Sequence, residues 1–288
     1  MADRLQLESA PTARPALRPE GAEDLASIVI PRFRTEDLVR LCLRAIRRLT
    51  DPPYEVIVVD NHSADASLEY LRQVRWIRLI ERGPETEPDA VFAHASAMDI
   101  GTAAARGHWL VSFHTDTIVR REGWLETMLG RLRDNPRAAA LGADKIDSDP
   151  GWYRAMKRMW DTHRAKAFVR RVVGLPPNPR YSPEWYPRSF CAIYRLDLVR
   201  SLGLTWQPAG RPTGELLYRG LVDAGYDAVQ LSSEEMRSYV EHVAHATALV
   251  ARGGLGHWRG NQKVRQALGR VMGSELAKEL LSDDSLDR

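Results

Sequence analysis

The sequence predicts an α/β protein with a mixed, mainly parallel sheet of the Rossmann-like kind, flanked by helices. Strand and helix patterns alternate from Ser27 to Leu71, which is typical of a parallel, helix-covered sheet. The run "WLVSF", Trp109–Phe113, is apolar throughout, as in strands that are buried on both faces. The polar residues "HTD" follow it directly, and ligands of open α/β sheets collect beyond the carboxyl ends of such strands.

The first elements follow from local patterns. The β-branched run Ser27–Pro31 predicts a strand, and Thr35 caps a predicted helix whose first turn carries two acids, which the helix dipole favours. The apolar residues of that helix recur at helical spacing: Leu38, Leu41, Cys42, Ala45, Ile46 and Leu49. A second strand, "YEVIVVD", ends at Asp60 and precedes a polar turn and a second helical pattern.

The next elements lead to the polar turn. A third strand is predicted over Arg75–Glu81, and an Ala-rich helix over Val91–Arg106, closed by Gly107 as a C-cap. The strand that ends in "HTD" then places Asp116 at the sheet edge, where it is available for chemistry. The alternative is that Asp116 is only a turn residue or a helix cap.

Three segments in this order resemble the inverting glycosyltransferases of family two, which use nucleotide-sugar donors and have the GT-A fold. The resemblance covers 27–245. The segments are "SIVIPRFRTEDLVRLCLRAI", "EVIVVDNHSADASLEYL" with Asp60, Asn61, Ser63 and Asp65, and "DIGTAAARGHWLVSFHTD" with Gly101, Ala105, Gly107 and Asp116.

The resemblance implies a divalent cation, Mn²⁺ or Mg²⁺, that Asp116 holds against the donor diphosphate. Asp116 matches the last residue of the family's D-x-D motif, whereas His114 replaces the first. Imidazole suits Mn, Fe or Zn better than Mg, so His114 either shifts the metal preference or only hydrogen-bonds the donor ribose.

Further donor contacts follow from the same resemblance. Asp60 is expected to contact a uracil or thymine ring, and Pro31 to begin the loop beneath that base. The alternative for Asp60 is an Asx turn that closes the strand. The other donor-binding residues expected are Arg32, Asp99, Arg106 and Thr115.

The acceptor side is less explicit. The family's catalytic Glu-Asp pair is missing, and Glu215, at the start of a helical pattern, is the nearest carboxylate. We predict Glu215 as the general base, with a first-turn acid that only stabilises the helix dipole as the alternative. His242 matches a late histidine that completes the metal or diphosphate site, although His245 is close enough to serve instead. A surface or core histidine is the plain alternative.

The segment Trp152–Arg180 is basic, with apolar residues every fourth position in its first part. We consider a lid over acceptor or donor phosphate, a peripheral contact with anionic lipid, or a solvated helix that packs its tryptophans on the core.

The predicted organisation is a disordered arm over 1–26, a GT-A domain over 27–250 and a helical extension over 251–288. Within the domain, 27–145 forms the nucleotide-sugar half and 146–250 the acceptor half. The short terminal helices need a surface to cover, either their own domain or a second subunit, so a homodimer is one hypothesis.

Composition limits the classes of partner and the cellular locations to be expected. A net charge of +3 over 288 residues, with no nucleic-acid motif, argues against nucleic acid. Two cysteines without metal-ligand spacing are typical of a reduced, cytoplasmic protein, with the inner face of the membrane as an additional location. We find no apolar run near the about 20 residues that span a bilayer.

The sequence therefore predicts an inverting glycosyltransferase that moves a sugar from a UDP- or dTDP-linked donor to a hydroxyl of a glycan, lipid or small metabolite. The alternative is a non-catalytic nucleotide-sugar-binding protein, because His114 and the missing acid pair both depart from the family at sites of chemistry. A nucleotidyltransferase fits less well, because the Gly-rich, Lys-bearing loop after the first strand is missing.

Overall fold

A computed structural model describes residues 24–51, 53–87, 89–144, 172–173, 185–252 and 258–288. The predicted arm, except for 24–26, lies outside the described residues. So does the basic segment Trp152–Arg180, except for 172–173. The predictions of a disordered arm, a lid and a lipid contact therefore stay predictions.

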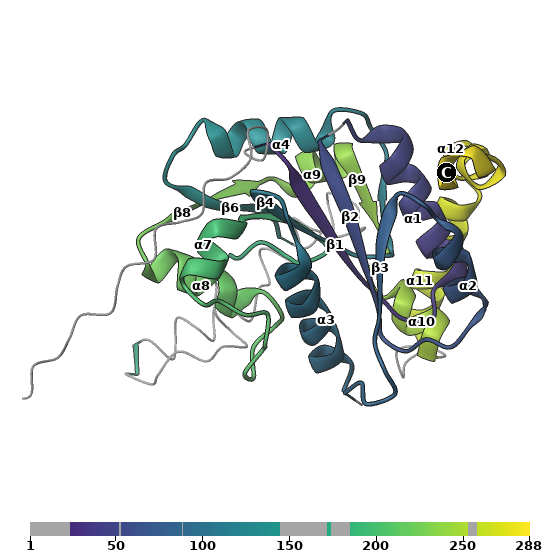
Figure 1. Cartoon of the computed structure of the whole chain (residues 1–288), viewed down its shortest axis with the longest axis horizontal. Helices are drawn as coiled ribbons and strands as arrows, with labels where there is room; N and C mark the ends of the chain where they lie inside the picture. The colour runs from purple at the N-terminus through teal and green to yellow at the C-terminus, as the bar shows by residue number, and fades with distance from the viewer. Residues whose placement is uncertain (1–23, 52, 88, 145–171, 174–184, 253–257) are drawn as a thin grey trace, which may run out of the picture.

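The core is a seven-stranded sheet in the order β3-β2-β1-β4-β7-β6-β8 (Figure 1). In this sheet β7 runs antiparallel between β4 and β6, and every other neighbouring pair is parallel. The predicted mixed, mainly parallel sheet is confirmed. The strands are β1 (Ala26–Arg32), β2 (Tyr54–Asp60), β3 (Ile77–Glu81), β4 (Trp109–Phe113), β6 (Ala138–Ala143), β7 (Cys191–Arg195) and β8 (Asp227–Leu231).

Helices cover both faces of the sheet. Successive strand residues point to opposite faces, so one strand contributes side chains to two apolar clusters. Ile28 and Ile30 of β1 belong to one apolar cluster, and Val29 belongs to the other. The first cluster includes residues of α1 (Glu36–Leu49), α2 (Ala66–Gln73), α4 (Trp124–Arg133) and α9 (Ser233–Tyr239). The second includes residues of α3 (Ala90–Ala104), α7 (Leu196–Ser201) and α8 (Glu215–Asp223).

Two predicted strand boundaries shift. β1 runs through Pro31 to Arg32, so Pro31 does not begin a loop. It is tolerated there although it has no N–H, because the pairing of β1 with β4 ends at Val29. β3 begins at Ile77 rather than at Arg75.

Gly107 is not the C-cap of α3, because that helix ends at Ala104 with Ala105 as its cap. The glycine is needed for a close approach instead. A Cβ at Gly107 would lie 2.3 Å from the carbonyl oxygen of Leu25, at the start of the sheet. A Cβ at Gly101 would lie 2.2 Å from Cγ1 of Val29, so α3 packs directly on β1.

A second, two-stranded sheet joins distant parts of the chain. β5 (Thr117–Val119) pairs antiparallel with β9 (Val240–His242), and Thr117 lies opposite His242. The amide of Val243 also donates to the carbonyl of Asp116, at 2.9 Å. This pairing brings the late histidine next to the "HTD" turn.

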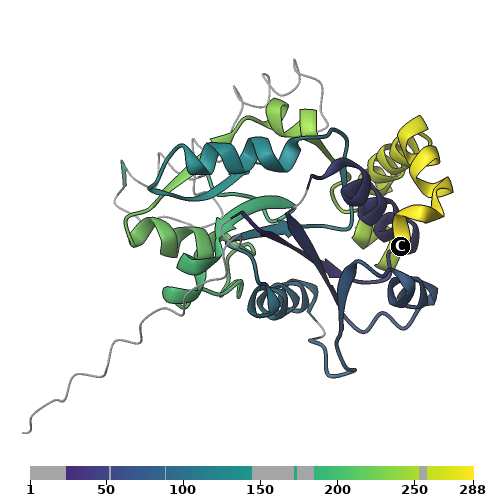
Figure 2. The same ribbon diagram turned by 45° about the horizontal axis from the view of Figure 1, so that its top comes forward.

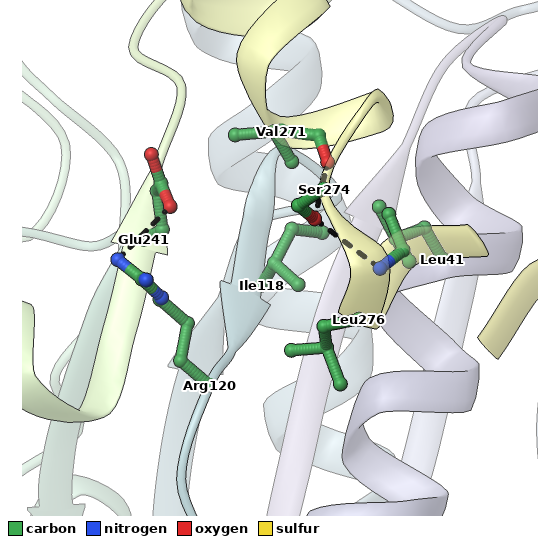
Figure 3. Close-up of a pocket in the computed structure, with 8 residues that line it drawn as sticks. Leu41, Ile118, Arg120, Glu241, Val271, Ser274 and Leu276 are labelled. Atoms are coloured by element: carbon green, nitrogen blue, oxygen red, sulfur yellow. Dashed lines mark hydrogen bonds and ion pairs between the residues drawn. The ribbon is translucent and has the colours of Figure 1, made fainter. Parts of the chain in front are cut away.

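The C-terminal extension covers its own domain. Its described elements are α11 (Trp258–Met272), α12 (Glu275–Ser282) and a 3-10 turn (Asp284–Asp287), and α12 lies beside α1 in both overall views (Figures 1 and 2). The helix before them, α10 (Ala246–Arg252), begins inside the predicted domain and crosses its predicted boundary at residue 250. Leu276 of α12 and Val271 of α11 line a small pocket with Leu41 of α1 and Ile118 of β5 (Figure 3). Of the two predicted surfaces, the chain's own domain is thus covered, and dimerisation stays a prediction.

Arg44 of α1 binds the end of this extension. Its guanidinium is buried and donates to the carboxylates of Asp287 and Asp284. It also donates to the carbonyls of Leu280 and Leu281, which are among the last of α12. Helix ends leave such carbonyls without partners inside the helix, so one side chain satisfies both the helix end and two acids.

Two aromatic residues add to the same contact. The Tyr70 hydroxyl donates to Asp287 Oδ1 at 2.8 Å, and Trp76 Nε1 donates to the carbonyl of Leu286 at 2.8 Å.

No helix within the described ranges is both long and apolar enough to cross a membrane.

We expect Asp287→Ala to lower the free energy of unfolding by about 3 kcal/mol, because it leaves the buried Arg44 charge without its main partner. Urea denaturation of the full chain measures this. Asp284→Ala is the matched control: its side chain is 86% exposed, and its loss should cost no more than about 1 kcal/mol. Equal losses for the two variants would contradict this account of Arg44.

Candidate metal centre

Asp116 lies in the turn between β4 and β5, where the amide of Thr117 donates to the carbonyl of His114 at 3.1 Å. Its side chain is only 5% exposed. Among the described residues, its Oδ1 is buried without a hydrogen-bond donor. A buried carboxylate oxygen without a partner is costly, so this atom calls for a ligand.

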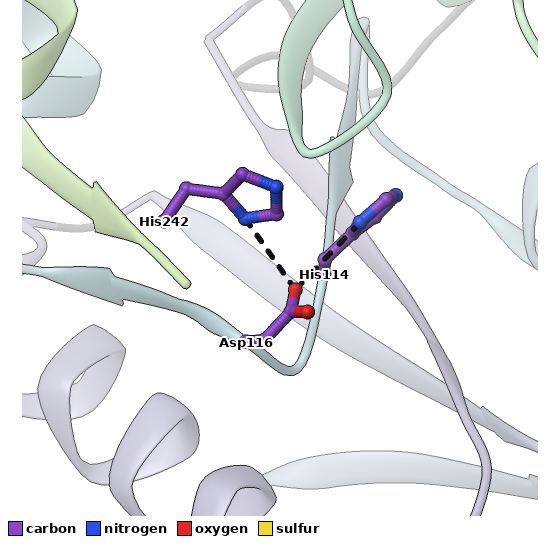
Figure 4. A group of neighbouring side chains, drawn as sticks. All are labelled: His114, Asp116 and His242. Carbon is purple, nitrogen blue, oxygen red and sulfur yellow. Dashed lines mark ion pairs between the residues drawn. The ribbon is translucent and has the colours of Figure 1, made fainter. Parts of the chain in front are cut away.

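Two imidazoles face this oxygen (Figure 4). Nδ1 of His242 lies 3.4 Å from Asp116 Oδ1, and Nδ1 of His114 lies 3.8 Å from it. One ligand atom from each of the three side chains falls within 4.8 Å of the others. Two ring nitrogens and a carboxylate are a donor set that fits a divalent transition metal, so the residues present fit the implied cation.

Burial sets the charge state of these groups. It lowers the pKa of His114 well below its ordinary value, and neighbouring His94 and His242 lower it further. Burial also lowers the pKa of His242, against the opposing effect of Asp116. The imidazoles are therefore neutral near pH 7, with a lone pair on one nitrogen, which is the form that binds metals. Burial raises the pKa of Asp116, while His242 opposes the rise.

Other side chains hold the two rings in place. Nε2 of His114 lies 3.1 Å from the Ser189 hydroxyl, and Nδ1 of His242 lies 3.1 Å from the Thr117 hydroxyl. The His242 ring stacks on Phe190, with centroids 4.5 Å apart and planes 13° apart. The Ser189 contact is made by the His114 nitrogen that does not face Asp116, as is usual for metal-binding histidines, whereas the Thr117 contact is made by the same Nδ1 of His242 that faces Asp116. His245 is exposed, so the structure brings His242 rather than His245 to Asp116.

His94 is a neighbour of this group that no sequence pattern indicates. It projects from α3, and its ring meets the His114 ring edge-on, with centroids 4.9 Å apart. Its Nε2 is buried and has no hydrogen-bond partner in the described part of the chain. Burial lowers the pKa of His94 to about 4. A single histidine in an Ala-rich helix carries no local signal of a site.

Asp60 and Arg32 form a buried ion pair at the carboxyl ends of β2 and β1. Arg32 also pairs with Asp65. Ser63 donates to both oxygens of Asp60, through its amide at 3.0 Å and its hydroxyl at 2.6 Å. Asp60 thus accepts from the amide three residues on and not two residues on, as the Asx turn of the alternative would require, and its contact with a base stays a prediction.

Two other predicted donor residues lie apart from the metal centre. Asp99 accepts from the Trp206 amide and the Gln207 side chain, so it joins α3 to the segment between α7 and α8. The Arg106 amide donates to Glu55 Oε1, at the first residues of β2. Because β2 and β4 are both parallel to β1, Arg106 lies at the opposite sheet edge from Asp116, and its prediction as a donor-binding residue is corrected. Thr115 is buried within the "HTD" turn.

Glu215 begins α8 after Gly214, whose φ of +87° favours glycine. The Glu215 side chain is 7% exposed. Its Oε1 accepts from Arg211 Nη1 at 2.6 Å and from Arg219 Nε at 3.0 Å.

The segment 185–190 runs between Glu215 and the metal centre. Trp185 packs edge-on against Tyr218, which lies on the same face of α8 as Glu215. At the other end, Ser189 meets His114. Glu215 is therefore at the same edge of the sheet as Asp116.

Comparison with known proteins identifies the family of this chain. Residues 27–202 match the model of the family Glycosyl transferase family 2, and the chain belongs to this family. The structure resembles the mannosyltransferase PcManGT of Pyrobaculum calidifontis, solved in complex with GDP-Man and Mn²⁺, with 17% identity and a TM-score of 0.51 over 93% of this chain and 80% of that one. It also resembles TarS of S. aureus, with 15% identity and a TM-score of 0.50 over 86% of this chain and 43% of that one.

The fold is thus the GT-A fold expected from the sequence. By sequence, the chain is similar to the glycosyltransferase GlyG of Streptococcus pneumoniae serotype 4, with 26% identity over 123 residues. That match spans 41% of this chain and 38% of GlyG.

We expect Asp116→Asn to raise the melting temperature of the metal-free protein, because the amide removes a buried charge whose Oδ1 has no described hydrogen-bond donor. The gain should be on the order of 1 kcal/mol, within the cost of an unsatisfied buried polar group. Thermal unfolding in a chelator measures it. A lower melting temperature would mean that the Asp116 charge stabilises the fold by itself.

Proposed function

We propose that this protein is an inverting glycosyltransferase that moves a sugar from a nucleotide-diphosphate donor to a hydroxyl acceptor. The observation that carries the proposal is the buried, unpartnered Oδ1 of Asp116 between two imidazoles, at the carboxyl edge of a GT-A sheet. Ligands of open α/β folds bind at this edge. Family membership supports the reaction class.

Asp116, His114 and His242 would hold the cation. When bound, a divalent cation neutralises charge on the diphosphate and so makes it a better leaving group. Ser189 would keep Nδ1 of His114 turned toward Asp116 before the donor arrives, because it contacts the other ring nitrogen, Nε2. The cation proposed is Mn²⁺ or Mg²⁺.

A UDP- or dTDP-linked donor is proposed from Asp60. Each carboxylate oxygen has two lone pairs, and the described hydrogen bond to Asp60 Oδ2 comes from the Ser63 amide alone. A second donor, such as the imide N–H of uracil or thymine, fits on Oδ2. Cytosine presents an acceptor at that ring position, so a CDP-linked donor should bind less well.

Glu215 is the proposed general base. In a single displacement, the acceptor oxygen bonds to the anomeric carbon while the bond from that carbon to the diphosphate oxygen breaks. The acceptor proton passes to a carboxylate oxygen of Glu215. Both described guanidinium contacts use Oε1, which orients the group and directs Oε2 as the proton acceptor. Segment 185–190, which carries Trp185 and Tyr186, would line the acceptor side and stack on a sugar ring.

A glycan, a lipid or a small molecule is proposed as the acceptor. A non-catalytic nucleotide-sugar-binding protein is the second candidate function. The observation that favours it is the pair of arginines on Glu215, which hold the only carboxylate proposed as base in an ion-pair network. Binding of a sugar nucleotide without any turnover would support this candidate.

The proposal is tested by incubating the full chain with UDP-, dTDP-, GDP- and CDP-sugars and Mn²⁺ or Mg²⁺, and measuring the nucleoside diphosphate released. We expect turnover with a UDP- or dTDP-sugar, and a loss of at least about 10²-fold in Asp116→Asn, the size of effect that loss of one transition-state stabilising group produces. Wild-type rates in Asp116→Asn would exclude Asp116 from the reaction.

Glu215→Gln should lower the turnover number by at least about 10²-fold, with donor affinity nearly unchanged, because the amide keeps the shape but accepts no proton. Asp144→Asn is the comparison variant. Asp144 follows β6 directly and pairs with Arg188, at the same sheet edge. A two- to three-fold loss in Glu215→Gln together with a large loss in Asp144→Asn would transfer the role of base to Asp144.

A further inference from the structure

We propose that a cavity between β9 and α11 binds a phosphate-bearing ligand. The cavity has a volume of about 170 Å³ and lies where the two-stranded sheet meets the C-terminal extension. Of its lining residues, all except Arg120 lie beyond residue 202, where the family match ends. The inference goes beyond the proposed function, because it concerns a cavity to which the transfer reaction assigns no role.

Three guanidinium groups line the cavity, and each comes from a different part of the chain. Arg120 follows β5, Arg237 lies on α9, and Arg270 lies in the last turn of α11. Glu241 is the one acid among the described lining residues. Positive charge therefore exceeds negative charge by two, with the imidazole of His242 counted as neutral. A phosphate group carries a charge of about −1.5 to −2 at pH 7 and so matches this excess.

The fold alone does not explain why these cations converge. The helix dipole favours a cation in the last turn of a helix, which accounts for Arg270. It gives no reason for Arg120 and Arg237 to line the same cavity from two other parts of the chain. A cleft lined mainly by one sign of charge attracts counter-ions. An anionic ligand among the three guanidiniums would compensate their charge.

The guanidiniums have donors for such a ligand. Arginine has five N–H donors, and its planar fork suits the oxygens of a phosphate. The described ion pair of Arg120 uses Nη1, which lies 3.1 Å from Glu241 Oε2 (Figure 3). In the described part of the chain, no ion pair or hydrogen bond engages the Arg270 side chain. Solvent reaches both residues, because the Arg120 side chain is 53% exposed and Arg270 is exposed, so a ligand can enter from solution.

A ligand in this cavity would also act on β9. Val240 and His242 of that strand line the cavity, and so does Val243, the residue after it. The amide of Val243 donates to the carbonyl of Asp116, and Nδ1 of His242 faces the Asp116 carboxylate. A ligand that holds β9 in this position therefore favours the arrangement of His242 and Asp116. Any such coupling between two sites is reciprocal.

The test is phosphate binding by the full chain, after removal of divalent cations and without any sugar nucleotide. Titration calorimetry at constant ionic strength, with sodium phosphate and with glycerol 3-phosphate, gives the affinities. We expect saturable binding with a Kd of about 1 mM or tighter.

Two variants should change this affinity in opposite directions. Arg270→Gln removes a charge-assisted contact and should weaken phosphate binding at least about five-fold. Glu241→Gln removes the acid from the lining and should strengthen binding about three-fold. The matched control is Arg265→Gln, which removes an exposed arginine of the same helix that is not among the lining residues. This control should bind phosphate as the wild type does.

The contact with β9 has its own readout. The backbone amide NMR signals of Val240–Val243 should shift when phosphate is added to the wild type, and far less in Arg270→Gln at the same concentration. Signals of this segment that stay unchanged at saturation would overturn the effect on β9.

The phosphate can belong to a soluble molecule or to a lipid head group, and the experiment separates these sources. Glycerol 3-phosphate represents the first. Flotation with phosphatidylcholine vesicles that contain phosphatidic acid represents the second. Binding to these vesicles that Arg270→Gln loses and Arg265→Gln keeps, without binding of glycerol 3-phosphate, would assign the site to a head group.

Equal affinities of the wild type, Arg270→Gln and Arg265→Gln would overturn the site. Absence of saturable binding to phosphate, glycerol 3-phosphate and the vesicles would overturn it as well. The measurements need neither a cation nor a donor, so a failure of this inference leaves the proposed function intact. Absence of sugar transfer would likewise leave the phosphate site intact.

Discussion

The candidate site depends on the pairing of β5 with β9. This two-stranded sheet places His242 opposite Thr117, although the two residues are 125 positions apart in the chain. Two backbone contacts fix the geometry: the strand register itself and the hydrogen bond from the Val243 amide to the Asp116 carbonyl. Without this pairing, Asp116 and His114 would be a turn with an unpartnered carboxylate and no third ligand.

The C-terminal extension packs against β5, one of these two strands. Ile118, the middle residue of β5, packs with Val271 and Leu276 of the extension. Arg44 holds the end of α12 against α1, and α1 in turn lies against β5. The extension lies beyond the part of the chain that the family model matches, yet it packs against the strand that follows the His114–Asp116 turn. Its contribution to stability and the geometry of the site are therefore coupled.

Local patterns were sufficient to predict the first half of the fold. The strands β1, β2 and β4 and the helix α1 follow from apolar periodicity and first-turn acids, which depend only on neighbouring residues. The placement of Arg106 was predicted wrongly, because sequence adjacency to a motif does not say at which sheet edge a loop lies. Gly107 was predicted as a helix cap, whereas the structure needs a glycine there because the carbonyl oxygen of Leu25 lies too close for a Cβ. This contact joins segments that are far apart in sequence.

The same limit explains what the sequence could show of the site. Asp116 and His114 come from one contiguous motif, so they were predictable as a pair. His242 was predictable only through resemblance to a family, and the structure was needed to choose it over His245. No sequence pattern indicated His94 or Ser189, because both are distinguished only by their contact with the His114 ring in the folded chain.

Two buried acids in this protein differ in how far the fold itself compensates their charge. Asp60 is 1% exposed and accepts hydrogen bonds from Arg32 and twice from Ser63, so its charge is compensated within the fold. Asp116 is equally withdrawn from water, but its Oδ1 meets only the nitrogens of two neutral imidazoles, at 3.4 and 3.8 Å. A neutral imidazole has one lone pair available, so the two rings and the carboxylate together can bind a cation. The arrangement therefore suits a cation, and this contrast within one sheet edge is the physical reason why we propose the cation at Asp116 and not at Asp60.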